Sequence, residues 1–227
     1  MRTIGAGKGV QPVRLPPHAP GLRIGLFGGS FDPPHEGHLL ASRLALTRLR
    51  LDRLWWLVTP GNPLKETRAP APLLARLSAA RRLARDPRIV VTDIEAQLGL
   101  RYTADLIAYL RRHCPGVRFV WIMGADNLLQ FHRWRKWERI MRQVPLAVID
   151  RPGTTLKASS AIAVKRHAGA RMPEKAGHLL ASAGLPAVVI LHGPRSNQSS
   201  SALRALNETN PGKSVSSCAA DPSRANK

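Results

Sequence analysis

Two histidines three positions apart, His35 and His38, are of a type and spacing that could bind and stabilise negative charge. They follow a turn rich in glycine and proline that begins at Gly28, between an apolar run, 22–27, and an amphipathic stretch that starts at Gly37. This order predicts a strand, a tight turn and a helix whose first turn carries both rings on one side. Free backbone N–H groups collect at such a helix N-terminus, where an anion is favoured. The stretch therefore predicts a site for a nucleotide triphosphate.

The neighbours of His35 and His38 decide which chemistry the two rings can support. Imidazole groups beside free backbone N–H groups can donate hydrogen bonds to phosphate oxygens and stabilise the charge that develops in a transition state. A single histidine in such a turn would more often cap or pack the helix, but two of them in the frame GGSFDPPHEGH favour phosphate binding. Metal binding is a further alternative, which the lack of a clear third ligand in this stretch disfavours.

The composition is that of a globular and strongly basic protein of 227 residues. Hydrophobic residues make up 44% of the chain, and 35 Lys and Arg against 14 Asp and Glu give a formal net charge of +21. Such a charge indicates either a solvated basic surface or attraction of polyanions, which include nucleic acids and phosphorylated small molecules. Cys114 and Cys218 stand far apart, no signal peptide is visible, and no run of about 18 apolar residues occurs, so we expect a cytoplasmic protein.

Short apolar runs alternate with amphipathic stretches from residue 22 onward. The runs expected to form strands are 22–27, 54–59, 88–93, 117–123, 146–149 and 186–192. Helices are expected at 37–50, 72–85 and 103–113, where apolar residues recur at three-to-four spacing. Compact apolar runs are typical of parallel strands that are covered on both faces. The pattern predicts an α/β fold, a Rossmann-like, doubly wound, mostly parallel sheet with helices on both faces, whose ligands gather at the carboxyl ends of the strands.

The ends of the chain lack this alternation. We expect residues 1–20 to form a flexible N-terminal arm and residues 208–227 a disordered C-terminal tail. A single domain then spans 21–207. Within it, 153–185 is rich in Lys, Arg and His and is interrupted by glycine and proline, which predicts a small helical subregion and not a second domain.

The frame 28–38 resembles the signature of the nucleotidyltransferase superfamily of α/β adenylyltransferases. Its His-x-Gly-His core also occurs in class I aminoacyl-tRNA synthetases, so a second motif is needed to separate the two. The segment 199–204, SSSALR, resembles the superfamily's C-terminal Ser-Ser-Thr-x-Ile-Arg motif, with Ser201 in place of Thr and Leu203 in place of Ile. Hydroxyls that open a helix again make an anion site, and Arg204 offers a fork for phosphate. A synthetase would instead need a Lys-rich second motif and a longer chain.

The middle of the chain is similar to the family of bacterial nicotinate-nucleotide adenylyltransferases. The segments that carry this similarity are TPGNPLK at 59–65, YTADL at 102–106, WIMGADNL at 121–128, FHRW at 131–134 and DRPG at 150–153. The second of them departs from the family pattern at Asp105. The similarity implies transfer of the adenylyl group of ATP to nicotinate mononucleotide, which gives nicotinate adenine dinucleotide (deamido-NAD) and pyrophosphate in NAD biosynthesis.

The resemblance also implies which residues do this work. The catalytic residues, which hold and neutralise the triphosphate, are expected to be His35, His38, Lys65 and Arg204. ATP is expected to contact Gly28, Gly29, Ser30, Phe31, His35, His38, Gly124, Asp126, Ser199, Ser200, Ser201 and Arg204. Nicotinate mononucleotide is expected to contact Ser30, Phe31, Lys65, Tyr102, Thr103, Trp134 and Arg151. Mg²⁺ is expected to be held through the ATP phosphates, with no protein ligands. The tryptophans expected in the core are Trp55, Trp56, Trp121 and Trp137.

Several alternatives remain open from the sequence. Lys65 could be a loop charge and Asp126 a helix N-cap. The acceptor could be nicotinamide mononucleotide or phosphopantetheine, although phosphopantetheine enzymes are shorter and lack the Phe-x-x-Trp stretch. A basic nucleic-acid-binding protein is disfavoured, because the arginines are spread over many predicted helices without interleaved aromatic residues. The expected partners are ATP and nicotinate mononucleotide, no membrane is expected, and a homo-oligomer is left open.

Overall fold

The computed structural model describes residues 13–61, 70–150 and 160–193 of the chain. The predicted arm, 1–20, is described only from residue 13, and the predicted tail, 208–227, lies outside the described residues, so the domain boundaries remain predictions. The site residues that also lie outside them are Lys65, Arg151, Ser199, Ser200, Ser201 and Arg204.

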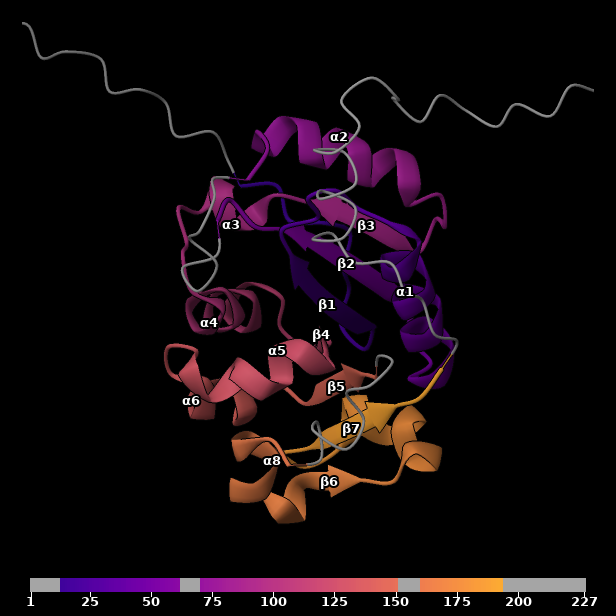
Figure 1. Cartoon of the computed structure of the whole chain (residues 1–227), viewed down its shortest axis with the longest axis vertical. Helices are drawn as coiled ribbons and strands as arrows, with labels where there is room; N and C mark the ends of the chain where they lie inside the picture. The colour runs from indigo at the N-terminus through magenta and orange to yellow at the C-terminus, as the bar shows by residue number, and fades with distance from the viewer. Residues whose placement is uncertain (1–12, 62–69, 151–159, 194–227) are drawn as a thin grey trace, which may run out of the picture.

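Within the described residues, seven parallel strands form one sheet in the order β3-β2-β1-β4-β5-β7-β6 (Figure 1). In chain order the strands are β1 Arg23–Gly29, β2 Arg53–Val58, β3 Ile89–Thr92, β4 Arg118–Gly124, β5 Leu146–Ile149, β6 Arg171–Met172 and β7 Val188–Leu191. All but β6 coincide with the predicted runs to within a few residues. The short edge strand β6 was not predicted, because its two residues form no apolar run and Pro173 follows them directly.

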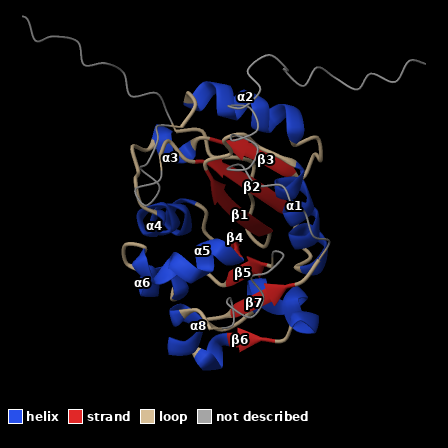
Figure 2. Ribbon diagram, in the orientation of Figure 1, coloured by secondary structure: helices blue, strands red, loops and turns tan. Residues whose placement is uncertain are grey.

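Helices cover both faces of the sheet (Figure 2). The α-helices are α1 Glu36–Arg48, α2 Leu73–Leu83, α3 Ile94–Gln97, α4 Thr103–His113, α5 Ala125–Gln130, α6 Trp137–Met141 and α8 Ile162–Arg166, and the 3₁₀ helices are η1 Phe131–Arg133, η2 Ala168–Ala170 and η3 Glu174–Ser182. One apolar core joins the sheet to α3, α4, α5, α6 and α8, and a second joins it to α1, α2 and η3. The doubly wound α/β fold predicted from the sequence is confirmed.

Alternate residues of the strands supply the two cores. Trp55 and Trp56, neighbours on β2, are both fully buried but point into opposite cores, as successive side chains of a strand must. On α4, Leu106, Ile107 and Leu110 are buried at the three-to-four spacing that predicted the helix. The predicted helical subregion 153–185, described from residue 160, contains α8, η2 and η3 together with β6.

The strand order creates a switch point between β1 and β4. From β1 the chain moves outward to β2 and β3, and then returns to place β4 on the other side of β1. Loops that leave the carboxyl ends of β1 and β4 therefore diverge, and an open sheet of this kind binds its ligands in the crevice between them. None of the described helices is long and apolar enough to cross a membrane.

Candidate active site

The turn after β1 brings the two predicted histidines together. His35 is the N-cap of α1 and His38 is its third residue; both are buried, and their ring centroids lie 3.9 Å apart. The backbone N–H of His35 donates to Nδ1 of His38 over 3.2 Å. Because Nδ1 accepts this bond, the proton of a neutral His38 ring must be on Nε2. The turn therefore presents His38 with its Nε2–H as the donor.

A buried serine fixes the first turn of α1 on which His38 lies. The hydroxyl of Ser42 donates to the carbonyl oxygen of His38 over 2.7 Å and accepts the indole N–H of Trp56 over 2.8 Å. The backbone of His38 is thereby tied to the fully buried side chain of Trp56 on β2. A serine inside a helix carries no distinctive motif, so this role of Ser42 could not be predicted from the sequence.

The side chain of Phe31 belongs to the core. Its ring is buried and stacks on Trp56 with a centroid distance of 4.9 Å, and it lies 4.7 Å from the ring of His38. The backbone of Phe31 has a φ of 47°, a left-handed conformation that is uncommon for a residue with a side chain. Its predicted contact with the nucleotides is therefore limited to the backbone of the turn, and its ring instead supports His38.

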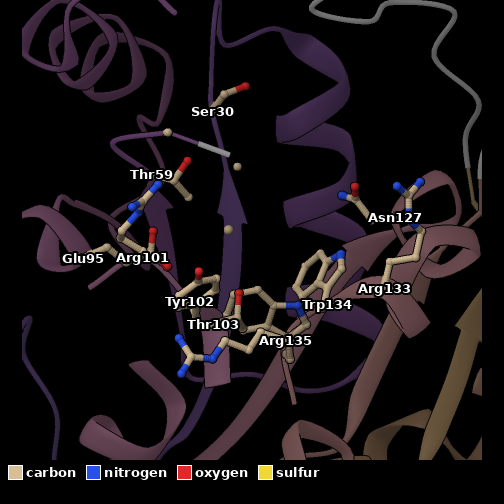
Figure 3. A pocket seen from close by; sticks show the side chains of 14 residues that line it. Ser30, Thr59, Glu95, Arg101, Tyr102, Thr103, Asn127, Arg133, Trp134 and Arg135 are labelled. Carbon is tan, nitrogen blue, oxygen red and sulfur yellow. The ribbon is translucent and has the colours of Figure 1, made fainter. Parts of the chain in front are cut away.

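A cavity of about 290 Å³ opens at the carboxyl ends of β1, β2 and β4, beside this turn (Figure 3). The predicted site residues that line it are Gly28, Gly29, Ser30, Tyr102, Thr103 and Trp134. The residues that line it but were not predicted as site residues are Thr59, Gly61, Glu95, Arg101, Trp121, Asn127, Arg133 and Arg135. The fold thus gathers at one crevice the segments near residues 30, 102 and 134, which are distant in the sequence.

Trp121 forms part of the cavity wall where β4 lies beside β1. Its side chain is 2% exposed, so it belongs to the core as predicted, yet it also lines the cavity. A Cβ atom at Gly28 would lie 2.9 Å from Cη2 of Trp121, closer than side-chain atoms tolerate. Glycine at position 28 therefore lets the indole lie against the end of β1.

Aromatic contacts hold Trp134 at the cavity. Its ring meets those of Phe131 and Trp121 edge to face, with centroid distances of 5.3 Å and 6.2 Å. The backbone N–H of Trp134 also donates to the carbonyl oxygen of Phe131 over 2.9 Å. The indole is thus half-buried and fixed by two core side chains, which suits it to pack against a flat ring in the cavity.

Three exposed arginines, Arg101, Arg133 and Arg135, give the cavity a positive lining. The guanidinium carbon of Arg135 lies 4.5 Å from the centre of the Tyr102 ring, a cation–π contact that joins the segment after η1 to the start of α4. Figure 3 shows Arg101 on one side of the cavity and Arg133 on the other. Arg101 directly precedes Tyr102, and Arg133 and Arg135 flank Trp134 in the sequence. This proximity to predicted site residues could have indicated that the three arginines line the site.

Among the described residues that line the cavity, Glu95, on α3, is the one with a carboxyl group. It is buried, and burial raises the pKa of its carboxyl to about 7. Near neutral pH about half of Glu95 is therefore uncharged, so it offsets the three arginines less than a fully ionised carboxylate would. The cavity fits an anionic ligand with a flat ring.

Replacing Glu95 with glutamine should remove a pH dependence of stability. The folded-state pKa is raised from 4.5 to about 7, so the stabilising contribution of the neutral carboxyl is complete below pH 4.5 and is lost as the pH rises through 7. The free energy of unfolding of Glu95→Gln, minus that of wild type, should therefore increase by about 3 kcal/mol as the pH is raised from 4.5 to 8. Urea unfolding of both proteins across this range measures the gain. A difference between the two that stays constant with pH would contradict the assignment.

The remaining predicted residues either do not line the cavity or lie outside the described residues. His35 and His38 do not line the cavity. They come after Ser30, a lining residue, in the turn between β1 and α1 and at the start of α1. Gly124 is the N-cap of α5 and Asp126 lies in the first turn of that helix; neither lines the cavity, whereas Asn127 does. Across 13–61, 70–150 and 160–193, no group of three or more His, Cys, Asp or Glu side chains could hold a metal ion.

Comparison with known proteins bears on this site. The family described as cytidylyltransferase-like matches residues 26–206. A protein of Methylorubrum extorquens named "Probable nicotinate-nucleotide adenylyltransferase" is 58% identical over 81% of this chain and 99% of its own length. A Mesorhizobium japonicum protein of the same name is 54% identical over 84% of this chain and 98% of its own. The solved structure "Plasmodium falciparum nicotinic acid mononucleotide adenylyltransferase complexed with NaAD" superposes with a TM-score of 0.60, covering 81% of this chain and 83% of that one; at 16% identity the likeness concerns the fold.

Proposed function

The chain belongs to the nicotinate-nucleotide adenylyltransferases, a family of cytidylyltransferase-like fold, and we propose that its cavity binds nicotinate mononucleotide while the histidine turn binds ATP. The family predicted from the sequence is confirmed. The enzyme transfers the adenylyl group of ATP to nicotinate mononucleotide and releases pyrophosphate. Which residues hold each substrate is the part that we propose.

One observation carries the assignment of the two substrates. A positively lined cavity with a fixed indole, that of Trp134, opens at the switch point directly beside the turn that carries His38. A nicotinate ring is flat, and the mononucleotide carries a carboxylate and a phosphate, so it matches the aromatic wall and the guanidinium groups. The triphosphate of ATP matches the donors at the start of α1.

The reaction needs positioning more than a chemically reactive side chain. A phosphate oxygen of the mononucleotide attacks the α-phosphorus of ATP, a new P–O bond forms, and the bond to the bridging oxygen of pyrophosphate breaks. Charge on the phosphate oxygens is stabilised by the Nε2–H of His38 and by backbone N–H groups of the turn. We propose that Lys65 and Arg204, which lie outside the described residues, neutralise the triphosphate. Holding the two phosphates in line supplies much of the remaining rate.

The divalent cation expected for this reaction is Mg²⁺, bound through ATP. The side chains at the turn fit that arrangement, because His38 offers an N–H donor to phosphate rather than a lone pair to a metal. Mg²⁺ commonly keeps several waters and is held mainly by substrate phosphates, where it neutralises their charge. The protein's part is then to hold the phosphates.

The cavity lining supports the acid over the amide as acceptor. Arg101, Arg133 and Arg135 can attract a nicotinate carboxylate, and the raised pKa of Glu95 limits the negative charge that would repel it. A carboxamide would lose a charge-assisted hydrogen bond, which is worth about 1.5–3 kcal/mol. We therefore propose that nicotinate mononucleotide is preferred to nicotinamide mononucleotide.

Parallel turnover assays with the three candidate acceptors test this proposal. We expect pyrophosphate release with ATP, Mg²⁺ and nicotinate mononucleotide, with kcat/KM about tenfold or more above that for nicotinamide mononucleotide, and no turnover of phosphopantetheine. Equal or greater kcat/KM for the amide would contradict the assigned specificity. Salt-sensitive binding to nucleic acid without any pyrophosphate release would favour the nucleic-acid alternative.

A further inference from the structure

Arg76, on α2, is a buried arginine. In each hydrogen bond found for it, the guanidinium donates to a backbone carbonyl oxygen. The residue is 3% exposed. Its Nε donates to Ala71 O over 2.8 Å, its Nη1 to both Ser30 O at 2.7 Å and Thr59 O at 2.8 Å, and its Nη2 to Pro60 O at 3.3 Å. Four bonds from a group with five N–H donors leave little of its capacity unused.

The carbonyls that Arg76 binds lie where two strands of the site separate. The pairing of β1 with β2 ends at Gly29 and Val58, and the last bond of the ladder runs from the N–H of Thr59 to the carbonyl oxygen of Gly29 over 3.0 Å. One residue later, Nη1 of Arg76 joins the carbonyl of Ser30 to that of Thr59. The guanidinium therefore continues the link between the two segments after strand pairing has stopped.

Both linked segments contribute to the site. Ser30 begins the turn that leads to His38, and it lines the cavity together with Thr59. Burial lowers the pKa of Arg76 whereas the nearby carboxylate of Asp32 raises it, and a guanidinium stays charged in either case. The carbonyls, together with the carboxylate of Asp32, compensate the buried cation, so the loops and the guanidinium hold each other in place.

We propose that Arg76 is a positioning residue for adenylyl transfer: by binding the carbonyls of Ser30 and Thr59, it fixes the histidine turn relative to the wall of the acceptor cavity. This rests on the proposed assignment of the turn to ATP and of the cavity to nicotinate mononucleotide. Arg76 does not line the cavity, so its effect passes through the two loops. Misplacing reacting groups by about 1 Å can cost about 100-fold in rate, which makes such a link catalytically significant.

Steady-state kinetics of Arg76→Met test this role. We expect kcat to fall by about 10- to 100-fold while KM for each substrate changes less, because each site persists but their alignment is lost. The decrease in kcat should be smaller for Arg76→Lys than for Arg76→Met, since an ammonium keeps the charge and three donors but lacks the planar fork. Arg82→Met is the matched control: Arg82 is on the same helix but exposed, and kcat should be unchanged. Enzyme concentrations are corrected for the folded fraction obtained from each melting curve.

Amide hydrogen exchange of the unliganded protein separates positioning from general destabilisation. In Arg76→Met we expect faster exchange in peptides covering 26–35 and 54–61 and unchanged exchange in 118–130, which contains β4 and α5. This readout needs no turnover, so it tests the link between the loops even if the proposed substrates were wrong. Wild-type kcat in a folded Arg76→Met, or exchange that rises equally in all three peptides, overturns the proposal. If Arg76→Met does not fold, the same two measurements on Arg76→Lys and Arg76→Gln decide it.

Discussion

Replacing His38 with alanine is expected to lower kcat for adenylyl transfer by about 100- to 1,000-fold, because the turn loses a preorganised donor to the phosphates. The bond from the backbone N–H of His35 to Nδ1 of His38 leaves Nε2–H as that donor. Pyrophosphate release at saturating ATP and nicotinate mononucleotide measures the change. Alanine also removes the contact with the Phe31 ring, so melting curves must show that the variant is folded at the assay temperature.

Amide replacements of His38 separate the donor from the acceptor. A glutamine places its amide nitrogen near the position of Nε2, whereas an asparagine places its polar group near Nδ1. If Nε2–H is the group that acts on phosphate, His38→Gln should keep more turnover than His38→Asn. Greater turnover in His38→Asn would contradict the assigned tautomer, and near-normal turnover in His38→Ala would remove His38 from the mechanism.

The parts of this site that depend on local sequence were predictable. The turn at 28–38 follows from an apolar strand, glycines and an amphipathic helix in immediate succession, and the helix 103–113 was predicted with the observed bounds. The family resemblance predicted that Tyr102, Thr103 and Trp134 contribute to one binding site. The strand order explains why they meet: Tyr102 and Thr103 come after β3 and Trp134 comes after β4, and these strands lie on the two sides of β1.

The parts that depend on tertiary contacts were not predictable. Arg76 stands on a helix that also carries Arg81 and Arg82, so it looked like one more exposed cation in a basic chain. Three of the four carbonyls that permit its burial, those of Ser30, Thr59 and Pro60, come from the loops after β1 and β2. Glu95 is a similar case, since a carboxyl in a short stretch of mixed polar and apolar residues gives no sign of the burial that raises its pKa.

Replacing Trp134 with alanine is expected to raise KM for nicotinate mononucleotide by about 10- to 100-fold, since stacking a flat heterocycle on an aromatic side chain is worth about 1–3 kcal/mol. The indole lines the cavity and is held edge to face by Phe131 and Trp121. KM for ATP should change little, because His35 and His38 do not line the cavity that Trp134 lines. Initial rates with one substrate varied at saturation of the other measure the two KM values.

Trp137 provides the matched control for Trp134. Its ring packs edge to face on the same Phe131, at a centroid distance of 5.9 Å, and edge to face on His167, at 5.8 Å, but it does not line the cavity. Trp137→Ala removes an indole of equal size from the same cluster, so it should lower the melting temperature while leaving KM for the acceptor near the wild-type value. Trp134→Phe keeps an aromatic face and should recover much of the loss in Trp134→Ala. Equal increases in acceptor KM for the two alanine variants would mean that the cluster shapes the cavity as a whole, and that Trp134 has no contact of its own with the nicotinate ring.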